Sequence, residues 1–345
     1  MVALLHVDAD SFFASVALRT RPHLVERPVA AAAHVIITSA NYPARARGVR
    51  SAMLVADALR LCPELVIIDV PQAEIEEVAE ALFDVFHSVA GTVEPGSMEE
   101  AFLDVGAGDL QEAASVGHQL RARVAAELGI PVSVGVGTTK LMAKLGSRAA
   151  KPDGLHVVDA VEEARLRSEL PTVEIWGVGG KTLERLTRLG VLRIGDLDHV
   201  PAAELQRECG TTMARRLRQI REGTDDAALR PVEQRTSLSA GGSIAGYARP
   251  NKSPAALAAQ SVDRACHRAE RAGLVAGGMT LTLTPEDGGG VILLKHSLAD
   301  PTASAEEWGD VAAGLIAGAS VPLLSSLTVT LTGLQPADRV APTLF

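Results

Sequence analysis

The sequence predicts an α+β protein of several domains, and three observations support this class. Residues 1–136 read as strand, helix, hairpin, helix and strand, which is the order of a split βαβ, ferredoxin-like sheet. Residues 160–222 form short Arg-rich segments joined by glycine turns, which predicts a small helical region. After a loose stretch at 225–235, strands and helices alternate again in a second βαββαβ-like order. At 345 residues the chain is too long for one compact core.

Apolar periodicity and proline or glycine breaks place the elements of the first half. A strand over residues 3–9 leads to Asp8 and Asp10, so two carboxylates lie where that strand ends. The other expected elements are a helix from 12 to a break at 22, strands over 29–33 and 35–39, one helix over 43–61, an amphipathic helix over 73–89, a hairpin over 91–105, a helix over 110–128 and a strand over 132–136.

In the second half, the expected turns are at 177–180, 190 and 210. Helices are expected over 254–272 and 304–317, and strands over 279–283, 291–294 and 327–331.

Composition excludes several classes of protein. The three cysteines, Cys62, Cys209 and Cys266, are far apart and form no CxxC pair, so a reducing cytosol is expected rather than a disulfide framework or a thiolate zinc site. No run of about 18 uncharged apolar residues appears, so no membrane span is expected. The net charge of −9 leaves no segment strongly basic. Any contact to nucleic acid must therefore come from local basic patches.

Two acidic segments are candidates for a metal site. Asp8 follows a buried strand, where a carboxylate is unfavourable unless it is paired or binds a metal, although capping of the next helix is the simpler explanation. Glu99 and Glu100 are adjacent and reach one site only at a bend, which the preceding Pro-Gly pair can supply; alone, they indicate a solvated acidic turn. Together, three carboxylates on neighbouring strands predict a two-metal site for phosphoryl transfer.

Three basic segments could contact phosphate. Tyr42 and Arg45 are three apart on an expected helix and so share a face, which suits a triphosphate or is an ordinary basic helix surface. A Gly-x-Gly turn opens a helix at residues 177–181, although helix–turn–helix joints often carry glycines. The third segment is a helical stripe that suits a phosphate track or an ordinary solvated face, formed by Lys140, Lys144, Arg148 and Lys151.

Taken in order, these segments resemble Y-family translesion DNA polymerases, most closely the bacterial polymerase IV type. The resemblance runs from about residue 5 to 197; beyond 237 it concerns topology alone. It is carried by His6-Val-Asp8-x-Asp10-x-Phe-Phe-Ala-Ser-Val, Ala40-Asn-Tyr-Pro-Ala-Arg, Gly48-Val-Arg-Ser-Ala-Met, Leu59-Arg-Leu-Cys-Pro, Lys140-x-x-Ala-Lys and Lys151-Pro-x-Gly.

The resemblance implies a right-hand polymerase that adds dNTPs to a primer 3′-OH and carries out low-fidelity translesion synthesis in DNA repair. It implies a cytoplasmic, monomeric bacterial protein. The implied domains are a ferredoxin-like palm at 1–10 and 71–159, small fingers at 11–70, a helical thumb with helix-hairpin-helix turns at 160–230, a linker at 231–236 and a βαββαβ little finger at 237–345.

The same resemblance assigns site residues by motif position. Asp8, the Ala9 carbonyl and Glu100 would hold two Mg²⁺ ions, or Mn²⁺ as a substitute, and Glu99 stands where the family has a further metal-binding aspartate. Phe13 stands at the steric gate that excludes a ribonucleotide 2′-OH. The remaining implied contacts are Phe12, Ser39, Tyr42, Arg45 and Lys151 to the dNTP, and Lys140, Lys144, Arg148, Gly177, Gly179 and Lys181 to primer–template DNA.

Departures from the family pattern leave a second hypothesis open. Glu99 carries one more methylene than the usual aspartate, so the chain could be a catalytically impaired relative that acts as a DNA-binding scaffold at stalled replication forks. Retention of the other site residues favours the enzyme. The tail Pro342-Thr-Leu-Phe345 faintly resembles sliding-clamp peptides but lacks their glutamine, and it suggests a clamp as a further partner.

Overall fold

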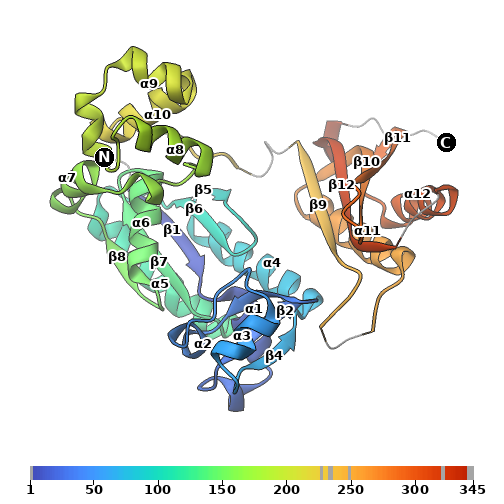
Figure 1. Ribbon diagram of the computed structural model, residues 1–345. Helices are drawn as coiled ribbons and strands as arrows, with labels where there is room; N and C mark the ends of the chain where they lie inside the picture. Colours follow the sequence, from blue (N-terminus) through green and yellow to red (C-terminus); the bar gives the residue numbers. More distant parts are fainter. Residues whose placement is uncertain (1–2, 226–227, 232–235, 248–249, 320–322, 340–345) are drawn as a thin grey trace. The chain divides into compact units, whose positions relative to one another are not determined.

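The computed structural model describes residues 3–225, 228–231, 236–247, 250–319 and 323–339 (Figure 1). The chain forms two compact units, one from residues 1–15 and 73–230 and the other from residues 16–72 and 231–345. Most of the expected linker, at 232–235, and the whole clamp-like tail, at 342–345, lie outside the described residues.

A five-stranded sheet of the order β5-β6-β1-β7-β8 forms the centre of the first unit. Its pairs are antiparallel except for β7 with β8. With α4 and α5 it gives the expected ferredoxin-like order of strand, helix, hairpin, helix and strand. The bounds are β1 Leu4–Ala9, α4 Gln72–Val89, β5 Thr92–Pro95, β6 Glu100–Asp104, α5 Leu110–Leu128, β7 Val132–Gly137 and β8 Leu155–Val157.

Strand β1 lies in the middle of this sheet and is buried along most of its length. Leu5 and Val7 are fully buried, and so is the polar residue between them, His6. The register places Asp8 opposite Glu100 on β6 and opposite Ser133 on β7. The Asp8 carboxylate of the central strand therefore lies between two neighbouring strands that carry polar side chains at the same level.

Helix α6 (Lys140–Ala150) packs unusually close to β7. A Cβ atom at Gly135 would lie 2.0 Å from both the Ala143 carbonyl oxygen and the Ser147 nitrogen, so only glycine fits there. Thr139 caps the helix by accepting a hydrogen bond from the Met142 N–H. This close contact fixes the distance between α6 and β7, and with it the position of the lysines on the helix.

The rest of the first unit is helical, as the Arg-rich segments predicted. Its core includes Leu186, Leu217 and Ile220. The buried Arg167 stabilises this region through ion pairs with Glu163 and Asp225. The elements are α7 Ala160–Glu169, the 3-10 helix Thr172–Glu174, α8 Gly180–Arg188, the 3-10 helix Ile194–His199, α9 Ala202–Cys209 and α10 Thr211–Glu222.

The second unit begins within α1 (Phe12–Leu18), which crosses from one unit into the other, and continues through the 3-10 helix Pro22–Leu24. A small sheet of the order β3-β2-β4 follows, from Val29–Ala33, Ile36–Ala40 and Val66–Asp69. The expectation of one helix over 43–61 is wrong. The structure has α2 (Tyr42–Ala46) and α3 (Val55–Leu61), because Gly48 at φ 90° and Ala52 at φ 66° turn the chain between them.

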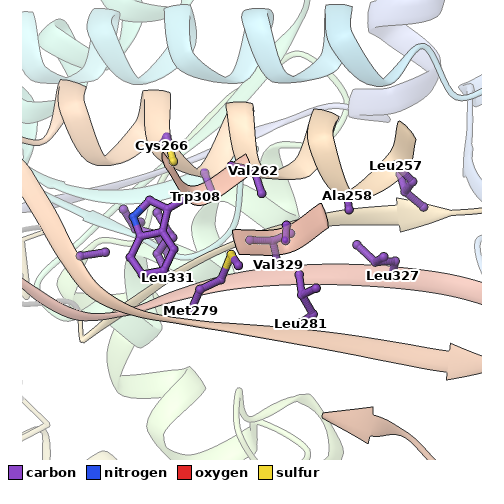
Figure 2. Packing of buried hydrophobic residues seen from close by; sticks show 14 of the residues in the cluster. Leu257, Ala258, Val262, Cys266, Met279, Leu281, Trp308, Leu327, Val329 and Leu331 are labelled. Carbon is purple, nitrogen blue, oxygen red and sulfur yellow. The ribbon is translucent and has the colours of Figure 1, made fainter. Parts of the chain in front are cut away.

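A four-stranded sheet of the order β11-β10-β12-β9 completes the second unit. Figure 2 shows its core, in which Val262 and Cys266 of α11 lie over Met279 and Leu331 of the sheet, next to Trp308 of α12. The order β9-α11-β10-β11-α12-β12 is the expected βαββαβ. The bounds are β9 Ser237–Ser243, α11 Pro254–Arg271, β10 Leu274–Pro285, β11 Ile292–Thr302, α12 Ala305–Gly318, β12 Leu324–Pro336 and a last 3-10 helix at Ala337–Arg339.

Among the described residues, the model contains no helix that has both the length and the apolar character needed to span a bilayer.

The contact between β7 and α6 gives a first prediction. Gly135→Ala should lower the free energy of unfolding by more than about 2 kcal/mol, because the new methyl group meets backbone atoms that cannot move aside. Urea titration followed by circular dichroism measures this change. Gly91→Ala is the matched control, since its Cβ would lie no closer than 4.0 Å to the Asp104 carbonyl oxygen, an ordinary van der Waals contact. Equal midpoints for the two variants would contradict the close packing.

Candidate active site

Three carboxylates meet at one end of β1 and β6. Asp8 pairs with Glu100 across the two strands, and Glu99 lies in the bend just before β6. The Ala9 N–H donates to the Glu99 carbonyl oxygen at 3.0 Å, and the Gly96 N–H donates to the Glu100 carbonyl oxygen at 2.8 Å. The bend that the sequence predicted after Pro95 is therefore present, and it sets the two glutamates beside Asp8.

The two glutamates have opposite electrostatic environments. Burial raises the pKa of Glu99, a hydrogen bond from Ser97 opposes this, and the negative charges of Asp8 and Glu100 raise it further. By contrast, the hydrogen bond with His6, followed by the contact with Lys144, lowers the pKa of Glu100 to about 2. The negative charges of Asp8 and Glu100 thus act on Glu99, so the three carboxylates lie in one electrostatic site.

Two lysines from the α6 region neutralise this site. The Lys151 ammonium lies 2.6 Å from Asp8 Oδ1 and 3.3 Å from Asp10 Oδ1. The Lys144 ammonium lies 2.6 Å from Glu100 Oε2. Within the described part of the chain, no three carboxylate, imidazole or thiolate groups converge as metal ligands. Asp8 and Glu100 are each paired with a lysine instead.

Asp10 has a structural role that the sequence did not reveal. Its side chain is fully buried and accepts hydrogen bonds from the Ser133 hydroxyl at 2.8 Å and from the Asp153 N–H at 2.7 Å. It thereby ties β7 to the loop after α6, the loop that begins with Lys151. The structure shows Asp10 holding this loop through both hydrogen bonds.

His6 also enters the site, although its motif position alone gave it no role. It lies two residues before Asp8 and therefore on the same face of β1. Its Nδ1 lies 2.6 Å from the Ser147 hydroxyl, and its Nε2 lies 3.3 Å from the Lys144 ammonium. Burial lowers the pKa of His6 below its ordinary value. The signal in the sequence was a histidine inside a buried apolar strand.

Aromatic rings border the site next to His6. The Phe102 ring lies 4.5 Å from the His6 ring and 5.6 Å from the Trp176 ring. The Lys144 ammonium lies 5.6 Å from the centre of the Trp176 ring, within cation–π range. A cavity of about 140 Å³ opens here, and its lining includes Asp8, Lys144, Arg148, Lys151 and Trp176.

The predicted basic stripe is present on α6, but its members are already engaged. Lys140 binds Glu94 at 2.5 Å and the Ala228 carbonyl oxygen at 2.9 Å. Arg148 lies 3.4 Å from Glu174, and Lys144 binds Glu100 as described above. Lys151 lies just beyond the last helical residue, as the C-cap. A role of Lys140, Lys144 and Arg148 in DNA binding therefore stays a prediction.

The predicted hairpin at 177–181 opens α8. Gly177 has φ 86°, and a Cβ atom there would lie 2.4 Å from an Arg216 nitrogen. Gly179 is the N-cap of α8 and makes no side-chain hydrogen bond. A Cβ atom at Gly179 would have no neighbour within 4 Å, and Lys181 is exposed. The hairpin presents backbone and a lysine to solvent, as a phosphate contact requires.

The predicted nucleotide contacts divide between the units. Phe12 and Phe13 begin α1 with ring centres 5.9 Å apart; Phe12 is buried and Phe13 half-buried. In the second unit, the Arg45 guanidinium lies 5.4 Å from the centre of the Tyr42 ring, so these two residues share a face of α2 as expected. Arg45 Nε donates to the Ala40 carbonyl at 2.7 Å, and the neighbouring Ser39 is buried.

Comparisons with known proteins identify the relatives of this chain. The model of the impB/mucB/samB family matches residues 7–148, and the model of the C-terminal domain of that family matches residues 250–344. The chain is 36% identical over 242 residues to DNA polymerase IV of Marinomonas sp. (strain MWYL1), a match that covers 68% of each protein. DNA polymerase IV of Pseudomonas syringae pv. syringae is 35% identical over 242 residues, again with 68% of each covered.

Solved structures agree on the fold over nearly the whole chain. The Y-family DNA polymerase chimera Dbh-Dpo4(243-245)-Dbh is 20% identical with a TM-score of 0.74, covering 97% of this chain and 99% of the chimera. DinB from Sulfolobus solfataricus is 21% identical with a TM-score of 0.68, covering 96% of this chain and 98% of DinB. With both family models and relatives above one-third identity, the chain belongs to the impB/mucB/samB family, the Y-family DNA polymerases of the polymerase IV type.

Proposed function

We propose that Asp8, Glu99 and Glu100 form the catalytic centre at which this polymerase joins a dNTP to a primer 3′-OH on a DNA template. The pairing of Asp8 with Glu100 across β1 and β6, with Glu99 in the adjoining bend, carries the proposal. Family membership makes the protein a template-directed translesion DNA polymerase. The assignment of residues rests on this geometry.

The donor set fits two divalent cations. Carboxylate oxygens of Asp8, Glu99 and Glu100, with the Ala9 carbonyl, are the hard ligands that Mg²⁺ prefers, and Mn²⁺ accepts the same set. Two bound ions would stabilise charge on the attacking and leaving oxygens of an in-line displacement. The longer Glu99 side chain is a competent ligand, and its raised pKa is consistent with a cluster of negative charge that a cation would relieve.

Lys151 would change partners as substrate binds. In the structure its ammonium neutralises Asp8 and Asp10, two charges that a cation would otherwise compensate. A triphosphate offers stronger competing negative charge, so Lys151 would turn to it. In the second unit, Tyr42 and Arg45 are a pair of the type that binds phosphate through a hydroxyl and a guanidinium. Ser39 and Phe12, one in each unit, are further proposed dNTP contacts.

The assignment extends to the domains and partners. The five-stranded sheet would be the palm, the segment with β2, β3 and β4 the fingers, helices α7–α10 the thumb and the four-stranded sheet the little finger. Primer–template DNA would contact Lys140, Arg148 and the hairpin of Gly177, Gly179 and Lys181. The protein would act as a monomer on DNA in the bacterial cytoplasm, with a sliding clamp as a partner for the tail. No comparison favours the scaffold alternative.

Primer extension tests the catalytic centre. The wild type should extend a primer on a template in Mg²⁺ and in Mn²⁺, whereas Asp8→Ala should lower the insertion rate by at least about 100-fold, because one shared ligand is lost. Glu99→Asp, which restores the family's aspartate, should keep activity. Rapid-quench assays with each dNTP measure the rates. Wild-type enzyme that binds primer–template but extends it in neither metal would support the scaffold alternative instead.

The Glu100 side chain depends on the absence of a side chain at Gly96. A Cβ atom at this position would lie 2.7 Å from Glu100 Oε1 and 3.0 Å from its Cγ. Gly96→Ala should therefore displace the carboxylate and slow dNTP insertion by about 10- to 100-fold. The midpoint of urea unfolding should hardly move, because a flexible side chain relieves the contact. Gly91→Ala in the same hairpin serves as the control. Normal insertion by Gly96→Ala would show that the position of Glu100 is not critical.

Phe13 gives a prediction about sugar selection. If its ring is the steric gate, Phe13→Ala should raise the rate of ribonucleotide insertion relative to deoxyribonucleotide insertion by at least about 100-fold, because the barrier to the 2′-OH is removed. Insertion of rNTP and dNTP opposite the same template base measures the ratio. Phe12→Leu, which keeps the neighbouring site apolar, should change it far less. An unchanged ratio in Phe13→Ala would place the gate elsewhere.

A further inference from the structure

We propose that Lys144, oriented by His6 and Ser147, is a positioning residue that fixes the Glu100 carboxylate, rather than a contact to the DNA backbone. The inference rests on the proposed function, because it concerns how the catalytic carboxylate is held. Four residues from three elements carry it: His6 from β1, Glu100 from β6, and Lys144 and Ser147 from α6.

Ser147 orients the His6 ring. Its hydroxyl donates a hydrogen bond to the Lys144 carbonyl oxygen at 3.0 Å. The same hydroxyl oxygen lies 2.6 Å from His6 Nδ1, so Ser147 links the His6 ring to the backbone of Lys144. His6 Nε2, on the other side of the ring, faces Glu100 and Lys144. Both His6 and Ser147 are almost fully buried, which keeps water from supplying other partners.

The Lys144 ammonium contacts both His6 and Glu100. It lies 3.3 Å from His6 Nε2 and 2.6 Å from Glu100 Oε2, while these two atoms lie 3.5 Å from each other. The Trp176 ring adds a cation–π contact at 5.6 Å. Lys144 is thus held by one charged, one neutral and one aromatic partner.

This arrangement restricts Glu100 from both sides. Lys144 holds Oε2, and Gly96 leaves only the space that Oε1 needs. The carboxylate therefore has a preferred rotation, with His6 setting the direction from which the lysine approaches. Among the other cations of the stripe, Lys151 binds Asp8, whereas Lys140 binds Glu94 and the side chain of Arg148 is largely exposed beside Glu174. Lys140 and Arg148 therefore touch no proposed catalytic carboxylate.

A contact to DNA and a positioning role predict different measurements. Loss of a phosphate contact lowers DNA affinity and reduces the slope of log affinity against log salt by about 1, while insertion at saturating DNA persists. Loss of a positioning residue leaves affinity and slope unchanged, but it slows insertion at saturating DNA and dNTP and weakens metal binding. The salt slope and the insertion rate therefore separate the two roles.

The experiment compares Lys144→Met, Lys144→Arg, His6→Leu, His6→Gln and the double variant His6→Leu/Lys144→Met. For each, primer–template affinity is measured at several salt concentrations, and single-turnover insertion is measured at saturating dNTP. Binding of Mn²⁺ is followed by electron paramagnetic resonance in a complex with a dideoxy-terminated primer and dNTP, where no reaction can occur. Arg123→Gln, on α5 and paired with Glu127, is the charge-loss control. Thermal unfolding confirms that each variant is folded.

We expect Lys144→Met and His6→Leu each to slow insertion by about 10- to 100-fold and to weaken Mn²⁺ binding, with the salt slope unchanged. The double variant should be no slower than Lys144→Met, because both act through one contact chain. His6→Gln, which keeps a hydrogen-bonding side chain, and Lys144→Arg, which keeps the charge, should recover part of the rate.

Wild-type insertion and Mn²⁺ binding in Lys144→Met, or a salt slope reduced by about 1 with normal insertion, would overturn the inference. Additive losses in the double variant would also overturn it, since they would mean that His6 does not act through Lys144. Failure of the proposed function looks different: wild-type enzyme would then not extend primers, or Asp8→Ala would remain active.

Discussion

The pairing of Asp8 with Glu100 at the end of the central strand is the constraint on which the first unit depends. Two carboxylates on adjacent strands, with a third in the next bend, would repel one another without compensation. Helix α6 and the loop after it supply the compensation through Lys144 and Lys151. These lysines reach the carboxylates because the helix lies almost on the backbone of β7. The requirement for glycine at Gly135 and the electrostatics of the site are therefore linked.

The sequence predicted those parts of the fold in which periodicity and local breaks agree with tertiary contacts. Helix α5 was placed correctly from its apolar pattern, and its ends are capped by Asp109 and Gly129. The single helix expected over 43–61 failed because a turn with positive φ at Gly48 and Ala52 divides an otherwise helical composition. Strand β9 was not among the expected strands, since Gly241 and Gly242 and its serines give little strand signal. Its pairing with β12 decides its conformation.

The sequence predicted only part of the candidate site. Asp8, Glu99 and Glu100 could be found because local spacing and a family resemblance mark them. Residues whose role depends on a distant partner could not. His6 binds a serine 141 positions away, and Asp10 accepts from Asp153, 143 positions away. Trp176 reaches Lys144 and Phe102 only in the folded unit. No local pattern contains such information.

The ion pairs of α6 also bear on how an acidic protein meets a polyanion. Glu94 and Glu174 occupy, within the protein itself, the places where phosphates would contact Lys140 and Arg148. A DNA duplex presents many phosphates along one track and can replace several such partners together. If Lys140 and Arg148 contact DNA as proposed, these carboxylates would favour a continuous DNA backbone over a single phosphate group.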